Sequence, residues 1–179
     1  GLTDYAGLKP HNTIFGEQTV GSRRDYITLQ FQYGISTRDI TTTLSGTGTT
    51  SAADSLAGVH TGAAIGSTEL RSKDIIRYRA GHEVVAMFTS MYKTEPGVDL
   101  KHGIRNGDDV ISFGYQGTVF GIWYKNGGVE TFTAQSDWSG DNLTVGSFVL
   151  DPTKLNIYKI QYGYLGIATI IFSVYCGLK

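Results

Sequence analysis

Hydrophobic and polar residues alternate along much of the chain, most clearly over residues 109–134. Apolar side chains fall at every second position there, namely Ile111, Phe113 and Tyr115, then Phe120, Ile122 and Tyr124. The run Asn126-Gly127-Gly128 then turns the chain back. A period of two bounded by glycine-rich turns is typical of antiparallel strands with one buried face. The sequence therefore predicts strands that place these six side chains inside and Trp123 on the outer face.

The same pattern predicts further strands on both sides of this segment. They cover residues 26–33, 57–61, 67–71, 75–79, 83–92, 102–105, 156–162 and 164–175. Residues 83–92 are nearly continuous in apolar side chains, which predicts a strand buried on both faces. Residues 93–99 predict a loop with a Pro96-Gly97 turn, and residues 135–146 a long loop containing Trp138. Asp151 before Pro152 predicts a single helical turn.

These elements predict an all-β chain. Roughly ten strands with almost no helix favour an antiparallel β-sandwich, jelly-roll-like, with at most one short helical turn. The 24 glycines among 179 residues agree with many tight turns. Residues 1–22 are weakly patterned and predict an N-terminal arm or linker, and residues 23–179 a single β-sandwich domain. The first residue is Gly1, and a strand runs almost to Lys179, which suggests a fragment of a longer protein.

Charge and cysteine content argue against several classes of partner. A net charge of −1 offers no basic field for a phosphate backbone, so we expect no nucleic acid. No apolar run approaches the ~20 residues of a membrane span, so we expect no membrane partner. Cys176 is the single cysteine, which excludes a disulfide within the chain and a cysteine-based zinc site, and it is expected in the core. We expect no metal and no cofactor.

Five short motifs follow one another in the second half of the chain. They are YRAG at 78–81, GYQGTVFG at 114–121, QSDW at 135–138, LDPTKLNIY at 150–158 and QYGYLG at 161–166. In this order they resemble a β-domain of virion structural proteins of tailed phages and large algal DNA viruses. The resemblance covers about residues 75–174. It departs at 102–109, which read HGIRNGDD where many relatives carry GLWDDQNG, and in a shorter loop after Trp138.

This resemblance implies a setting more than an activity. It implies a virion location and a fibre, spike or decoration module that meets the host surface. It carries no catalytic residues to this chain. The partners we expect are a glycan of the host cell wall and either a homotrimer or other virion proteins.

One loop region brings together residue types that could catalyse glycan cleavage. The candidates are Tyr92, Lys101, His102 and Arg105. A lyase acting on uronate glycans needs a cation for the carboxylate, a base for the C5 proton and an acid for the leaving oxygen. These residue types can fill those roles, although nothing in their spacing fixes the geometry, and a solvated loop is the alternative.

Aromatic and basic residues supply candidates for glycan binding. Trp123, Trp138 and Tyr124 could stack on sugar rings, or contact a neighbouring subunit. A basic cluster, Arg71, Lys73, Arg77 and Arg79, could bind an acidic sugar, or simply point to solvent. The loop carboxylates Asp108, Asp109, Asp137 and Asp141 are expected to cap turns, with Ca²⁺ binding as the alternative.

Three functions follow from these candidates. The leading hypothesis is a virion-associated structural or host-attachment module that contacts cell-surface glycan. The alternative is a virion-borne polysaccharide lyase acting on acidic glycan. The third is a cellular carbohydrate-binding module.

Overall fold

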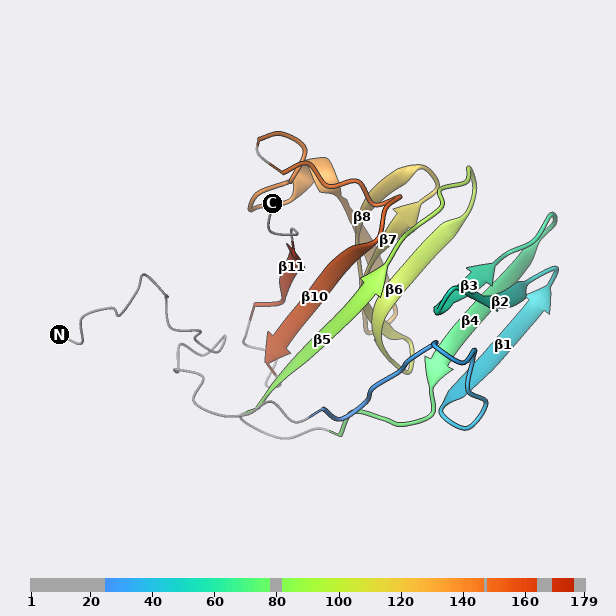
Figure 1. The fold of residues 1–179 in the computed structure, drawn as a ribbon. Coiled ribbons are helices and arrows are strands. Elements are labelled where there is room, and N and C mark those ends of the chain that lie inside the picture. Colours follow the sequence, from blue (N-terminus) through green and yellow to red (C-terminus); the bar gives the residue numbers. More distant parts are fainter. Residues whose placement is uncertain (1–24, 78–81, 147, 164–168, 176–179) are drawn as a thin grey trace. The chain divides into compact units, whose positions relative to one another are not determined.

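The chain is built from antiparallel β-strands in two compact units (Figure 1). A computed structural model describes residues 25–77, 82–146, 148–163 and 169–175. One unit spans Val20–Tyr78 and is called here the β1–β4 unit. The other contains Arg79–Lys179 and is called the β5–β11 unit. The all-β fold class is confirmed, and each unit is described by itself.

The β1–β4 unit consists of two pairs of strands. They are β1 (Ile40–Gly46), β2 (Thr49–Ala53), β3 (Leu56–His60) and β4 (Gly66–Ser72). Strand β1 pairs with β4 along its whole length, and β2 pairs with β3 as a hairpin. The Thr47 hydroxyl, in the loop between β1 and β2, shares its proton between the carbonyl oxygens of Thr61 and Ala64 in the loop between β3 and β4, at 2.8 and 3.0 Å.

The core of this unit is thin. Among its described residues, Ile40 is the one buried hydrophobic side chain, whereas Leu44, Val59 and Ile65 are exposed. The strands are rich in threonine, whose β-branched side chain suits a pleated surface even where little is buried. The strands predicted at residues 57–61 and 67–71 are confirmed as β3 and β4, whereas β1 and β2 were not predicted.

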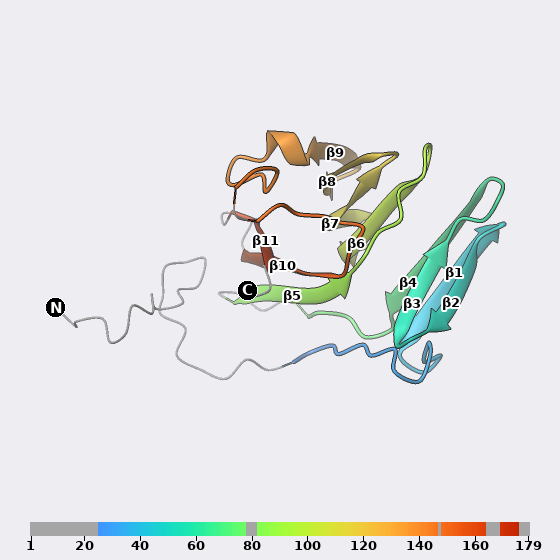
Figure 2. The same cartoon turned by 45° about the horizontal axis from the view of Figure 1, so that its top comes forward.

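The β5–β11 unit contains two sheets that face each other (Figure 2). One sheet has the order β11-β10-β5, formed by β11 (Ile171–Tyr175), β10 (Asn156–Gly163) and β5 (Glu83–Ser90). The other is a four-stranded meander of β6 (Asp99–Asn106), β7 (Asp109–Gln116), β8 (Val119–Asn126) and β9 (Val129–Ala134). A 3₁₀ turn, η1 (Gln135–Asp137), follows β9.

Aromatic side chains from both sheets form the core between them. Phe113 of β7 is fully enclosed, and its ring centroid lies 4.9 Å from Tyr158 of β10 and 5.2 Å from Phe172 of β11. Tyr158 and Ile160 are likewise fully buried. The alternation read from the sequence thus places one face of each sheet against the other, as in a β-sandwich.

Glycines set the register of the meander. Successive strands are joined by two-residue turns that begin at Gly107, Gly117 and Gly127, each with a φ of 58°. A positive φ at the first turn position matches the twist of paired strands and favours glycine. These turns fix which residues of neighbouring strands lie opposite each other.

Several predicted elements are corrected by the structure. Residues 26–33 and 75–77 form no strand, although both alternate. Strand β5 is not buried on both faces, because Met87 on its other face is 50% exposed. The predicted helical turn is a β-turn, in which the Lys154 amide donates to the Asp151 carbonyl at 3.1 Å.

Other predictions reach beyond what these strands show. Among the described strands, the meander and the three-stranded sheet do not form the two Greek keys of a jelly roll. Arg79, Cys176 and the predicted arm 1–22 lie outside the described residues. A single domain over residues 23–179 stays a prediction beside the two units.

Candidate functional site

The four candidate catalytic residues do not meet. Lys101 and Arg105 lie on one face of β6, while His102 lies on the other and pairs in register with Phe113. Tyr92 follows β5 and belongs to the core cluster between the sheets, 6% exposed. Side chains on opposite faces of a strand cannot act on one substrate atom. These four side chains therefore do not converge on one point.

Each of these side chains has a local structural contact. The His102 ring stacks on Phe88 at 4.0 Å, and desolvation by the surrounding protein lowers its pKa. Burial raises the pKa of the Tyr92 phenol well above its ordinary value. Arg105 donates from Nε to the Gly107 carbonyl at 2.8 Å, and Lys101 pairs with Glu130 at 2.6 Å. These contacts stabilise β6 and its turn.

The candidate stacking aromatics are largely covered. Trp123 faces away from the core, as predicted, but it is only 3% exposed because Phe132 packs on it at 4.8 Å. Trp138 packs against the core, 6.2 Å from both Phe113 and Phe120. Tyr124 keeps 38% of its surface exposed. No open row of aromatic rings is presented by these three side chains.

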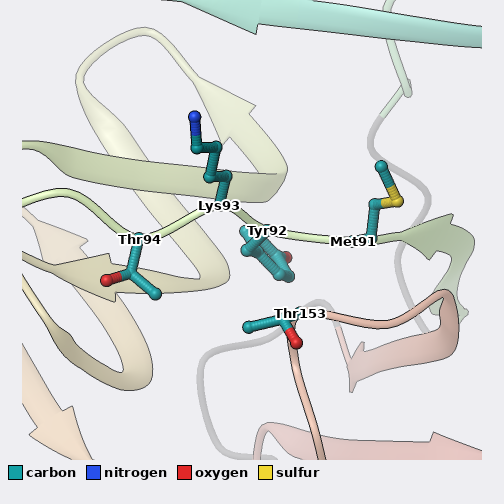
Figure 3. Close-up of a pocket in the computed structure, with 5 residues that line it drawn as sticks. All are labelled: Met91, Tyr92, Lys93, Thr94 and Thr153. Atoms are coloured by element: carbon teal, nitrogen blue, oxygen red, sulfur yellow. The ribbon is translucent and has the colours of Figure 1, made fainter.

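A shallow depression lies beside the core where β5 ends (Figure 3). Its volume is about 440 Å³, and its lining is Met91, Tyr92, Lys93, Thr94 and Thr153. The Tyr92 amide donates to the Pro152 carbonyl at 2.9 Å, which holds the two chain segments together. In Figure 3 the Tyr92 ring lies between them and Lys93 points away from Thr153. The lining is mostly apolar and offers little charge.

A second depression lies on the β1 and β4 pair and contains charge. Its volume is about 370 Å³, and it is lined by Thr41, Thr43, Glu69, Arg71, Ser72, Lys73 and Ile75. The register sets Thr41 opposite Arg71 and Thr43 opposite Glu69, so these four side chains share one face. Lys73 is held in place because its Nζ donates to the Thr37 carbonyl at 2.6 Å.

This depression contains two members of the predicted basic cluster. Arg71 and Lys73 line it, and Arg77 is exposed a few residues further along the chain. The hydroxyls of Thr41 and Thr43 were not among the predicted site residues, because β1 and its pairing with β4 were not predicted. The available signal was the run of three threonines, Thr41–Thr43, of which every second residue lies on one face of a strand.

Two of the four loop carboxylates, Asp109 and Asp141, cap turns as predicted, whereas Asp108 lies 3.9 Å from Arg105 and Asp137 accepts the Ser136 hydroxyl. Asp109 accepts the Gly127 amide at 2.9 Å, and Asp141 accepts the Leu143 amide at 2.8 Å. Over the described ranges, no three His, Cys, Asp or Glu side chains gather closely enough to hold a metal ion. Nor does that part of the chain contain a helix with the length and hydropathy to span a bilayer.

Comparison with known proteins adds no relative to this picture. No family model, no curated protein and no solved structure matches the chain.

Proposed function

We propose that the chain is a non-catalytic host-attachment module, of the kind carried on a virion, that binds acidic cell-surface glycan on its β1–β4 unit. One observation carries the proposal. The cations Arg71 and Lys73 and the hydroxyls of Thr41 and Thr43 line the same shallow depression.

These groups match the chemistry of a uronate sugar. The guanidinium of Arg71 can bind a carboxylate through two parallel hydrogen bonds, while Lys73 adds a second positive charge. The threonine hydroxyls donate to and accept from sugar hydroxyls, and Glu69 can accept from them. A shallow, open shape suits a polymer that passes over the surface.

The arrangement of the other candidates favours binding over cleavage. Tyr92 is enclosed between the sheets, and His102 lies across β6 from Lys101 and Arg105. A lyase needs its base, acid and cation around one sugar ring. The lyase therefore remains the alternative, without a geometry in its favour. The virion setting is supported by the order of the five motifs between residues 78 and 166.

Binding to a soluble polyuronate tests the proposal directly. The full chain should retain polygalacturonate in an affinity or calorimetric assay and should not retain neutral dextran. Arg71→Gln should weaken binding by about tenfold or more, because a hydrogen bond to a charged group contributes about 1.5–3 kcal/mol.

Lys93→Gln is the matched control for this test. Lys93 is highly exposed in the other unit and pairs with Glu95 at 3.6 Å. Lys93→Gln therefore removes one positive charge, as Arg71→Gln does. Equal weakening by both variants would reduce the effect to net charge and contradict the proposed site. Release of unsaturated sugar products, seen as new ultraviolet absorbance, would favour the lyase instead.

A further inference from the structure

The outer face of the meander holds Trp123 beneath an ion pair. Lys101 of β6 and Glu130 of β9 meet at 2.6 Å, and the Lys101 ammonium lies 4.0 Å from the centre of the Trp123 ring. Trp123 is 3% exposed although it lies on the face opposite the core. The Lys101 ammonium and the Phe132 ring both lie against the indole.

The ion pair joins opposite corners of the sheet. Strands β7 and β8 lie between β6 and β9, and Lys101 is level with Gly114 whereas Glu130 is level with Lys125. Contact across that diagonal requires the sheet to curl toward its outer face, as strongly twisted sheets do. The curl makes a concave surface around Trp123.

The floor of this concave surface is partly polar. Most residues on it beside Trp123 are small, namely Gly103, Ser112, Gly114 and Gly121, whereas the Phe132 ring packs over Gly121 and against Trp123. The Oγ of Ser112 and the Nε1 of Trp123 are buried and have no hydrogen-bond partner. An unmade hydrogen bond of a buried polar group destabilises the folded state, because the group has lost its bond to water. A ligand that brought hydroxyls to this floor would satisfy both groups.

The Lys101–Glu130 ion pair over Trp123 is easily opened. The side chains of Lys101 and Glu130 are 31% and 36% exposed, which places their ion pair at the surface. Exposed ion pairs contribute little to stability, because water solvates both charges when the pair opens. Opening the pair therefore costs little and exposes the part of the Trp123 ring that Lys101 covers, beside a free ammonium group, while Phe132 still packs on the ring.

We propose that this face is a second, latent glycan site closed by the chain's own carboxylate. The sugar ring of a uronate glycan would stack on Trp123, and its carboxylate would replace that of Glu130 on Lys101. Only the choice of ligand class rests on the proposed function. The site itself rests on separate residues in the other unit.

Two variants that break the same ion pair test this inference. Glu130→Gln and Lys101→Gln both abolish the ion pair, so a purely structural role predicts the same result for each. Our proposal predicts opposite results, because Lys101 is the ligand's partner and Glu130 its competitor. The readout is the indole N–H signal of Trp123 in two-dimensional NMR, assigned with Trp138→Phe, during titration with trigalacturonate.

We expect the Trp123 signal to shift on titration in the unmodified chain. The dissociation constant should fall several-fold in Glu130→Gln and rise about tenfold in Lys101→Gln. The exposed pair Glu95→Gln and Lys93→Gln makes the same changes of charge and should leave the constant nearly unaltered. No shift of Trp123 in the unmodified chain and in Glu130→Gln, or equal effects of the control pair, would overturn the inference.

Arg71→Gln separates the two sites. It should leave the Trp123 titration unchanged while it weakens polygalacturonate retention. Retention that depends on Arg71 with no Trp123 shift would keep the proposed function and overturn this inference. A Trp123 shift with retention independent of Arg71 would do the reverse.

Discussion

Buried tyrosines dominate the chemistry of the core at the scale of single residues. Tyr92, Tyr115 and Tyr158 lie with their ring centroids about 6 Å apart, at 6.0 Å for Tyr92–Tyr115 and 5.8 Å for Tyr92–Tyr158. Burial is the largest cause that raises the pKa of all three phenols, that of Tyr158 from 10.0 to about 12. The folded state therefore holds their protons more tightly than the unfolded state does.

The sign of this shift predicts alkaline unfolding. A phenol whose pKa is raised on folding stabilises the folded state fully below pH 10.0 and loses that contribution as the pH rises toward about 12. We expect these tyrosines to ionise in one cooperative step with loss of β-structure. Tyrosinate absorbance and circular dichroism, followed together, check this. Tyrosinate formation at full strength with the strands intact would contradict it.

At the scale of elements, strands β6 and β7 can pair because their backbones approach closely at Gly114. A Cβ on Gly114 of β7 would overlap the carbonyl oxygen of Leu100 on β6. Gly114→Ala should therefore destabilise the chain by about 1–3 kcal/mol, as overpacking does. Urea unfolding measures the loss. Gly140→Ala is the control, because nothing lies within 4 Å of a Cβ there, and comparable losses in both would refute the assignment.

The sequence predicts elements best where alternation and turn chemistry agree. Residues 109–134 carry both, and the structure has β7, β8 and β9 there with glycine turns between them. Residues 26–33 alternate equally well but have no paired strand, since alternation alone supplies no partner for the backbone. The threonine-rich strand β1 shows the opposite case. Its apolar pattern is too weak to predict a strand, but its backbone pairs with β4 along its whole length.

The candidate site was predictable only in part, for a related reason. Lys101, His102 and Arg105 are close in sequence, which is why they were predicted as one site. The pleat of β6 places His102 on the opposite face from the other two. The depression on β1 and β4 depends on residues about thirty positions apart that the register sets face to face, such as Thr41 and Arg71. Such pairing follows from strand order, which the sequence pattern does not specify.

The two units differ in core size at the scale of the whole molecule, and this predicts their order of unfolding. Of the ten buried hydrophobic side chains among the described residues, Ile40 alone belongs to the β1–β4 unit. Burial of apolar surface is the main stabilising term, so that unit should unfold at lower urea concentration. Both tryptophans, Trp123 and Trp138, lie in the β5–β11 unit, so tryptophan fluorescence reports on the unfolding of that unit alone.

Two measurements on one titration check this order. Circular dichroism, which reports all strands, should begin to fall before tryptophan fluorescence changes. Coincident curves would show that the chain unfolds as one cooperative body, in agreement with the single domain that the sequence analysis expected.

The curl of the meander has a consequence for self-association. A flat sheet offers its last strand as a template on which strands of other molecules can add indefinitely, which is how fibrils grow. Lys101 of β6 and Glu130 of β9 are in contact although these are the two edge strands of the sheet. The sheet must therefore bend out of plane between β6 and β9. A strand added there would continue the bend and leave no straight stack for the next molecule, so this sheet is a poor seed for fibrils.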